Sequence, residues 1–327
     1  MDFKTLSLKF NTDEKCRAYL EELRWGMTKR CPSCSSEKVR FDAKENRYVC
    51  KNCKKKFSVA NGTMFEHTRY PLTDWFKVIT LMLNAKQGIS AMEIMRNMDC
   101  SYKTAWYLAM RVRCAMIEQD ITLQNIVEMD ETYVGGKPRK VTKNADDSQP
   151  SISSISNKRG RGTKKTPVVG IVERNGQVVL QVTNRLTSKF LLDMLKGHVK
   201  IDNAIVMTDE YRGYQKFDDI VQHLTINHSK KEYSKGVVHT NTIEGFWTIV
   251  KNSIRGQYVA ISKKYLPFYL VQAQYIYNRR NATHDVFEGF LKDAMQIDKS
   301  DFMSYYKPVK EVPKLVYKTK KKLRIQT

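Results

Sequence analysis

The sequence predicts an α/β domain that follows a small zinc-binding module and a helical segment. Three observations indicate this arrangement. Strand-like and helix-like runs alternate over residues 121–285, which is the pattern of an α/β domain. Residues 70–120 carry apolar side chains at helical spacing, and residues 15–60 contain two C-x-x-C pairs. Residues 286–327 are expected to form a basic C-terminal tail.

The composition favours a polyanionic partner. Among 327 residues, 57 Lys and Arg face 34 Asp and Glu, which gives a net charge of +23. Self-repulsion of this size is usually offset by nucleic acid, an anionic membrane surface or an acidic protein. The sequence contains no apolar run long enough to span a bilayer and no signal-peptide core at its start. We therefore expect a cytoplasmic protein that binds DNA or RNA; from charge alone, a basic ribosome-associated protein stays an alternative.

The first chemical motif is a pair of C-x-x-C units separated by fifteen residues. Each unit can turn tightly and present two thiolates to one ion, and four thiolates complete a tetrahedral structural zinc site. The strand-like segments VRFDA and RYVCK lie between and beside the pairs, so a zinc ribbon is expected. The odd total of seven cysteines argues against a disulfide framework. The expected zinc ligands are Cys31, Cys34, Cys50 and Cys53.

The remaining cysteines are isolated and are expected to be small buried apolar residues: Cys16, Cys100 and Cys114. The ribbon itself is basic, because residues 28–57 hold ten Lys or Arg and three Asp or Glu. DNA is a plausible partner for this surface, although ribbons also bind proteins.

The segment after the ribbon resembles a helix-turn-helix. Ser90 with Glu93 three residues later forms a capping box at the start of one helix. A short turn follows, and a second helix is expected from Ser101 through residue 113. Its polar side chains would face DNA; they are Lys103, Thr104, Arg111 and Arg113. An ordinary helical hairpin is the alternative.

A second basic segment interrupts the α/β domain. Residues 137–166 are rich in Ser and contain nine basic residues against two acidic ones. Such a segment is expected to be a long loop that either contacts phosphate or is simply solvated.

Three acidic residues indicate metal-dependent chemistry. Asp130 and Asp209 each follow an apolar, strand-like run, and Glu244 lies on an expected helix, with 34 residues between it and Asp209. Carboxylates at the ends of adjacent strands meet at one edge of a sheet, and a helix packed there supplies a third. Mg²⁺ or Mn²⁺ prefers such oxygen ligands, and two ions can activate a nucleophile and stabilise the leaving oxygen of a phosphodiester.

The helix of Glu244 adds further polar groups on the same face. Asn241, Thr248 and Lys251 share that face at helical spacing. Lys251 could hold a DNA phosphate and Asn241 could reach a metal through its amide oxygen. His239 could touch substrate or cap the helix. The aromatic residues Phe246 and Trp247 are expected in the core.

These motifs resemble a known family. The segments DETYVGGK, RGRGTKKTPVVG, TDEYRGY and HTNTIEGFWTIVKNSIRGQY are similar to those of bacterial insertion-sequence transposases of the DDE type. The resemblance is to members that join an N-terminal transposase zinc ribbon to an ISXO2-like catalytic domain, and it covers about residues 15–285.

The resemblance implies an RNase H-like fold, a mixed five-stranded sheet flanked by helices. It implies that Asp130 and Asp209 are the first two acids. The family writes its third residue as Asn or Glu followed by Lys, so Asn241 and Glu244 both stay candidates beside Lys251.

The implied activity is Mg²⁺-dependent cleavage and strand transfer at the inverted repeats of an insertion sequence. Its implied partners are double-stranded element ends and target DNA, bound by a homodimer or larger assembly in a bacterial, nucleoid-associated setting. A catalytically silent DNA-binding regulator, or a domesticated derivative, is the alternative, and a structure-specific nuclease of the same fold is a third reading.

Overall fold

The structure is a computed structural model that describes residues 1–118, 120–135, 165–226, 238–282 and 285–295. Almost all of the basic loop expected at 137–166 lies outside these residues, as does most of the expected tail. These described residues divide into two compact units, one within 1–118 and 268–295 and one within 120–267. No helix in the described ranges has the length and apolar character needed to cross a bilayer.

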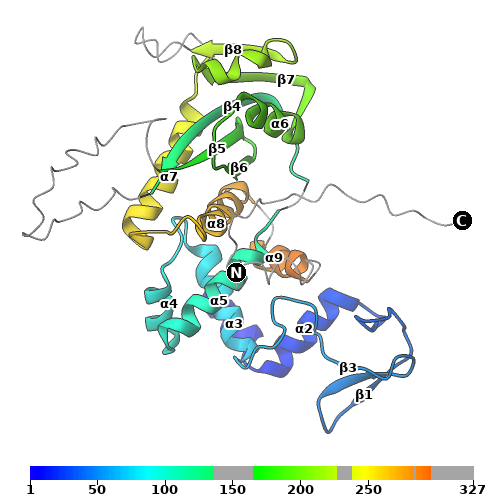
Figure 1. The fold of residues 1–327 in the computed structure, drawn as a ribbon. Helices are drawn as coiled ribbons and strands as arrows, with labels where there is room; N and C mark the ends of the chain where they lie inside the picture. The colour runs from blue at the N-terminus through cyan, green and yellow to red at the C-terminus, as the bar shows by residue number, and fades with distance from the viewer. Residues whose placement is uncertain (119, 136–164, 227–237, 283–284, 296–327) are drawn as a thin grey trace, which may run out of the picture. The chain divides into compact units, whose positions relative to one another are not determined.

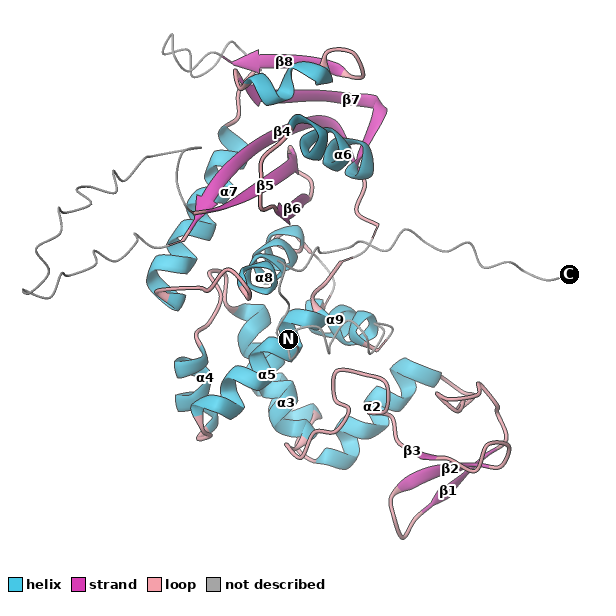
Figure 2. Cartoon of the chain, viewed as in Figure 1, coloured by secondary structure: helices cyan, strands magenta, loops and turns pink. Residues whose placement is uncertain are grey.

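The first unit is helical apart from the ribbon (Figure 2). Its helices are α1 (Phe3–Lys9), α2 (Asp13–Trp25), α3 (Leu72–Asn84), α4 (Ala91–Met98), α5 (Tyr102–Ala115), most of α8 (Leu266–Asn278) and α9 (Val286–Ala294). Ser90 caps α4, as expected, and accepts a hydrogen bond from the backbone N–H of Glu93; Ser101, at the expected start of the next helix, accepts one from that of Thr104. Asp99 takes the left-handed conformation that ends α4.

The segment expected as a tail begins with a packed helix instead. Phe287 and Phe290 of α9 are buried, and the ring of Phe287 lies 5.3 Å from that of Phe76 in α3. Helix α8 also belongs to this unit, since Arg113 donates to Gln272 at 2.9 Å and stacks on the ring of Tyr269. The helices after residue 267 thus complete the N-terminal core, although the sequence pattern assigned residues up to 285 to the catalytic domain and the rest to a tail.

The ribbon contains a three-stranded antiparallel sheet in the order β1 (Val39–Asp42), β2 (Arg47–Cys50) and β3 (Lys56–Phe57). The two strands expected from the sequence pair with each other, with Val39 opposite Cys50. Its small core contains Tyr48 and Phe57, whose stacked rings lie 5.6 Å apart. A core of this size needs the metal to hold it together.

The second unit is built on a mixed five-stranded sheet (Figure 1). Its strands follow the order β6 (Val178–Val182), β5 (Thr166–Glu173), β4 (Leu123–Val134), β7 (Val199–Asp209) and β8 (Gln222–Ile226). The first three strands are antiparallel, whereas β4, β7 and β8 run parallel. This order and these directions confirm the expected RNase H-like fold.

Helices cover both faces of the sheet. Helix α6 (Ser188–His198) and the 3₁₀ helix η2 (Arg212–Phe217) pack on one face, where Val127 and Met129 of β4 enter the main core. Helix α7 (Asn241–Ser253) lies against the opposite face, over β4 and β5, and continues into a π-helical turn, η4 (Ile254–Tyr258). Alternation along β4 therefore sends even-numbered side chains toward α7.

Candidate active site and zinc site

Strand β4 carries three carboxylates within four residues, and strand geometry separates them. Glu128 and Asp130 point to the α7 face, whereas Glu131 points to the α6 face and accepts a hydrogen bond from the Tyr214 hydroxyl at 2.9 Å. Parallel β7 pairs with β4 so that Met207 lies opposite Glu128. Asp130 and Asp209 stand two residues further along their strands, beyond this last printed pair, so the two parallel strands carry both carboxylates to the same edge of the sheet.

Both aspartates and the expected helical acid line one cavity. The cavity has a volume of about 470 Å³. Its lining residues come from β4, β7, α7 and the residue before α7: Asp130, Asp209, Thr240, Glu244, Trp247, Thr248 and Lys251. The structure therefore brings together all of the expected active-site side chains except Asn241. Asn241 is an exposed residue at the first position of α7 and is not part of the lining.

Asp130 is a cavity carboxylate whose pKa is raised by its surroundings. Its burial, followed by the nearby charge of Glu131 and then those of Asp209 and Glu244, raises the pKa of Asp130 to about 7. The indole N–H of Trp247 donates to its carboxylate at 3.1 Å. Such crowding of like charges is relieved when a cation binds between them.

The position of Trp247 depends on a glycine. Gly170 of β5 lies opposite Asp130 in the sheet register. A Cβ atom at Gly170 would lie 2.8 Å from Cζ2 of Trp247, closer than side chains approach. The absence of a side chain on β5 thus lets the indole lie against the sheet and reach Asp130. Trp247 is 2% exposed, as its expected core role requires, and no sequence signal indicates its contact with Asp130.

The other two acids are also held by local contacts. The carboxylate of Asp209 accepts a hydrogen bond from the backbone N–H of Tyr211 at 3.1 Å. Glu244 accepts one from the Thr240 hydroxyl at 2.9 Å. Lys251 lies two turns beyond Glu244 on the same face of α7, as the helical spacing predicts, and opens to the same cavity.

The three carboxylates are spread more widely than ligands of a single ion. In the part of the chain that the structure describes, only the four ribbon cysteines form a group of metal-ligand atoms all within 4.8 Å of one another. A pair of ions about 3.5–4 Å apart needs a broader set of oxygens. The cavity, lined by three carboxylates and a lysine, offers the oxygen ligands that hard divalent cations prefer.

The zinc site is built from two matching C-x-x-C turns, or knuckles, at residues 31–34 and 50–53. The backbone N–H of Ser35 donates to Cys31 O at 2.8 Å, and that of Lys54 donates to Cys50 O at 3.0 Å. Ser35 and Lys54 both take positive φ values, 56° and 60°. The repeated turn presents two thiols from each knuckle, as the C-x-x-C spacing predicts.

The sulfur positions fit a tetrahedral ion. Cys31 Sγ lies 3.7 Å from Cys53 Sγ, and Cys34 Sγ lies 3.6 Å from Cys50 Sγ. Zinc–sulfur bonds of about 2.3 Å place the corners of a tetrahedron ~3.8 Å apart, so the match is close. A hydrogen bond from the backbone N–H of Cys53 is the main cause that lowers the pKa of Cys50 to about 6, which favours the thiolate.

Two expectations about other side chains need correction. Arg111 and Arg113 are 7% and 1% exposed, so they do not present their guanidinium groups to DNA. Arg111 donates to Glu66 O at 2.9 Å, and Arg113 binds Gln272; both therefore hold the helical core together. Lys103 is exposed near the start of α5, as expected. Cys16 and Cys114 are buried, but Cys100 is only half-buried.

The fold and the site define an RNase H-like protein with an acidic cavity and a separate four-cysteine ribbon. Residues 122–278 match the ISXO2-like transposase domain, and residues 11–56 match the transposase zinc-ribbon domain. The chain belongs to the family of DDE transposases that combine these two domains.

A curated relative is an uncharacterized protein in the transposable element ISH50 of Halobacterium salinarum. It is 28% identical over 269 residues, which cover 80% of this chain and 89% of the relative. Because this relative is archaeal, it gives no support to the expected bacterial source.

Similarity to solved structures is weak. A simian T-cell lymphotropic virus intasome in complex with a PP2A regulatory subunit gives a TM-score of 0.29 at 11% identity, over 69% of this chain and 74% of that one. A pre-cleavage Mos1 transpososome gives 0.26 at 10% identity, over 70% and 75% of the two chains. Likeness at this level carries no argument about activity.

Proposed function

We propose that the protein is an active DNA transposase that cuts the ends of its element and transfers the freed strands to target DNA. The observation that carries the proposal is the single cavity that gathers Asp130, Asp209, Glu244 and Lys251 from two strands and a helix. A protein that only binds DNA has no use for three converging carboxylates, and like charges held together in a folded protein are a cost unless they serve a ligand.

In this proposal Asp130, Asp209 and Glu244 hold Mg²⁺ or Mn²⁺. The bound ions would supply an activated oxygen nucleophile and stabilise the oxygen that leaves phosphorus. Lys251 binds a non-bridging phosphate oxygen and places the scissile bond over the carboxylates. Trp247 keeps the Asp130 carboxylate directed into the cavity through its N–H.

Two substitutions at phosphorus account for the whole reaction. In the first, water attacks the phosphodiester at the element end, and the bond to the 3′ oxygen breaks to leave a 3′ hydroxyl. In the second, that hydroxyl attacks a target phosphodiester, which forms one new P–O bond and breaks another. Bond number is conserved in the second step, so no nucleotide triphosphate is required.

Glu244 is the better candidate for the third ligand. It lies in the cavity, whereas Asn241 lies outside the lining. A carboxylate also binds Mg²⁺ more strongly than a neutral amide oxygen does. Asn241 is assigned a secondary role near the substrate, at the exposed start of α7.

The test is cleavage of duplex DNA taken from both flanks of the gene, with Mg²⁺ or Mn²⁺ and without ATP. Asp130→Asn, Asp209→Asn and Glu244→Gln should abolish or nearly abolish cleavage, because each change removes a charged metal ligand. All three should keep DNA affinity. Asn241→Ala should retain measurable activity.

Three other outcomes would contradict parts of the proposal. A wild-type protein that binds these ends without cutting them would be the silent regulator. Cutting without strand transfer would indicate a nuclease. Inactive Asn241→Ala beside active Glu244→Gln would move the third ligand to Asn241.

A further inference from the structure

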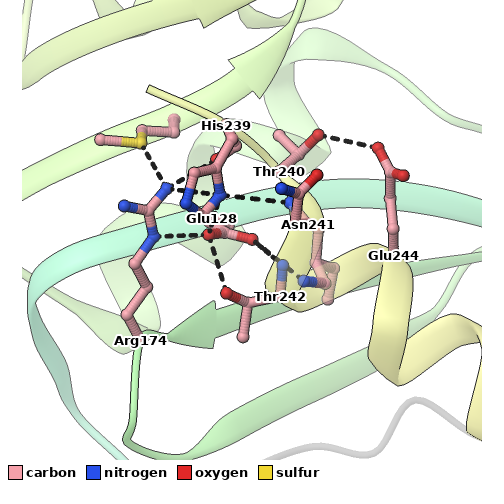
Figure 3. Close-up of polar contacts among 9 residues, drawn as sticks. Glu128, Arg174, His239, Thr240, Asn241, Thr242 and Glu244 are labelled. Atoms are coloured by element: carbon pink, nitrogen blue, oxygen red, sulfur yellow. Dashed lines mark hydrogen bonds and ion pairs between the residues drawn. The ribbon is translucent and has the colours of Figure 1, made fainter. Parts of the chain in front are cut away.

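Helix α7 begins without a cap of the usual kind. The side chain of its N-cap residue, Thr240, accepts no capping hydrogen bond from the backbone N–H groups of the first turn. The Thr240 hydroxyl instead donates to the carboxylate of Glu244 at 2.9 Å (Figure 3). The first N–H groups of the helix therefore need another acceptor.

Glu128 of β4 supplies that acceptor from 114 residues away in the chain. Its carboxylate accepts hydrogen bonds from the backbone N–H groups of Thr242 and Ile243 at 2.8 and 3.0 Å. It also accepts one from the Thr242 hydroxyl at 2.9 Å (Figure 3). A carboxylate at this end of a helix also interacts favourably with the helix dipole. Glu128 is 0% exposed, so these contacts are sheltered from water.

Arg174, the residue after β5, balances the buried charge. Its Nε donates to Glu128 at 2.6 Å, and its Nη2 donates to the backbone oxygen of His239 at 2.8 Å. The same Nη2 lies 2.9 Å from Nδ1 of His239. Because arginine only donates, this Nδ1 accepts, and the ring proton is on Nε2. Arg174 therefore joins the sheet to the residues just before α7.

We propose that Glu128 and Arg174 are the positioning pair of the active site, and that they fix α7 so that Glu244 faces Asp130. The inference rests on the proposed function, because it concerns the same cavity. Glu128 and Asp130 are two residues apart on one face of β4. One short piece of strand thus carries both the first acid and the anchor of the helix that carries the third.

A role in stability alone explains this pair less well. Buried ion pairs gain little over apolar side chains of equal size, because desolvation offsets their attraction. This pair instead fixes the position of a helix, because Glu128 accepts hydrogen bonds from two successive backbone N–H groups of α7. A role as a metal ligand is also disfavoured, since Glu128 is fully buried and does not line the cavity.

The experiment measures the melting temperature of the full-length protein as Mn²⁺ alone is added. The Mn²⁺ midpoint is the concentration that gives half of the maximal rise in melting temperature. Glu128→Gln keeps the size of the side chain and removes its charge. It should raise this concentration by about ten- to a hundredfold, the range seen when residues behind metal ligands are changed. Thr242→Val removes only the hydroxyl contact and should shift the concentration in the same direction by less. Asp209→Asn lacks a proposed metal ligand, so any rise in its melting temperature with Mn²⁺ measures binding elsewhere in the protein.

Leu195→Ala is the control for a general loss of stability. Leu195 is buried in α6, on the opposite face of the sheet, so it should lower the melting temperature without changing the Mn²⁺ midpoint. Midpoints for Glu128→Gln and Thr242→Val that equal the wild-type value would overturn the positioning role. If Glu128→Gln does not fold, Thr242→Val decides.

Cleavage of flanking DNA, measured in parallel, separates this inference from the proposed function. A wild-type protein that cleaves, together with variants of unchanged midpoint, removes only the positioning role. A wild-type protein that neither responds to Mn²⁺ nor cleaves removes both.

Discussion

At the scale of single residues, Asp130 links the acidity of the cavity to the stability of the metal-free fold. Its pKa, raised to about 7 chiefly by burial, lies above the ordinary value of 3.8. Between these values the folded carboxyl keeps a proton that the unfolded chain has released. The folded state therefore binds more protons, and its stability falls as pH rises through this window.

Asp130→Asn removes this penalty. Without added Mg²⁺ or Mn²⁺, the variant should be more stable than the wild type at pH 8, and the difference should shrink as pH falls from about 7 to about 4. Thermal melts across this range measure the effect. Saturating Mg²⁺ should reverse the order at pH 8, because only the wild type has the full ligand set. A stability difference between variant and wild type that does not change with pH would show that burial does not raise the pKa of Asp130.

Gly170 provides a second test at this scale. Gly170→Ala forces a methyl group against Trp247, and overpacking of this kind typically costs about 1–3 kcal/mol. Cleavage should fall by more than the loss of stability explains, since the indole can no longer hold Asp130. Gly197→Ala is the matched control: a Cβ there meets nothing within 4 Å, and alanine in a helix is favoured by up to ~1 kcal/mol. Equal effects of the two changes would contradict the packing argument.

Strand-end aspartates and a helical E-x6-K spacing can be recognised from neighbouring residues, and the structure places the acids of these motifs in one cavity, although the sequence leaves Asn241 and Glu244 both open as the third residue. It was not sufficient for Trp247, Gly170 or Glu128. Their roles arise from contacts between β4, β5 and α7, and nothing in a local pattern states which strand residue meets which helix residue. No sequence signal gives Glu128 a role, which depends on the hydrogen bonds that its carboxylate accepts from the backbone N–H groups of Thr242 and Ile243.

At the scale of elements, the ribbon should depend on one zinc ion. Cys50→Ser removes a buried ligand, so purified protein should fall from about one zinc per chain to almost none and should lose the protease resistance of residues 28–57. Cys100→Ser is the control, because Cys100 lies outside both knuckles and should leave the zinc content unchanged. Metal analysis with limited proteolysis measures both. A zinc-free wild-type protein with an intact ribbon would contradict the assignment.

Elements with local signals were well predicted, and those held by distant packing were not. The capping serines of α4 and α5 and the strands of the ribbon carry their signals in a few neighbouring residues. Helix α9 is indistinguishable from a basic tail in the sequence because Phe287, one of its apolar residues, packs against Phe76, more than two hundred residues earlier. For the same reason Arg111 and Arg113 were assigned to DNA, although their burial depends on Glu66 and Gln272.

At the scale of the whole molecule, the charge of +23 should make DNA binding strongly dependent on salt. Each phosphate neutralised contributes a slope of roughly −0.9 to the logarithm of affinity against the logarithm of salt concentration. Removing residues 316–327, which hold five Lys or Arg and lie outside the described structure, should weaken binding to every duplex alike and reduce the slope by at most ~4.5. Titrations with flanking and unrelated DNA between about 50 and 200 mM salt measure both effects. A flat salt dependence would exclude this electrostatic mechanism, and a loss confined to flanking DNA would mean that the tail reads bases.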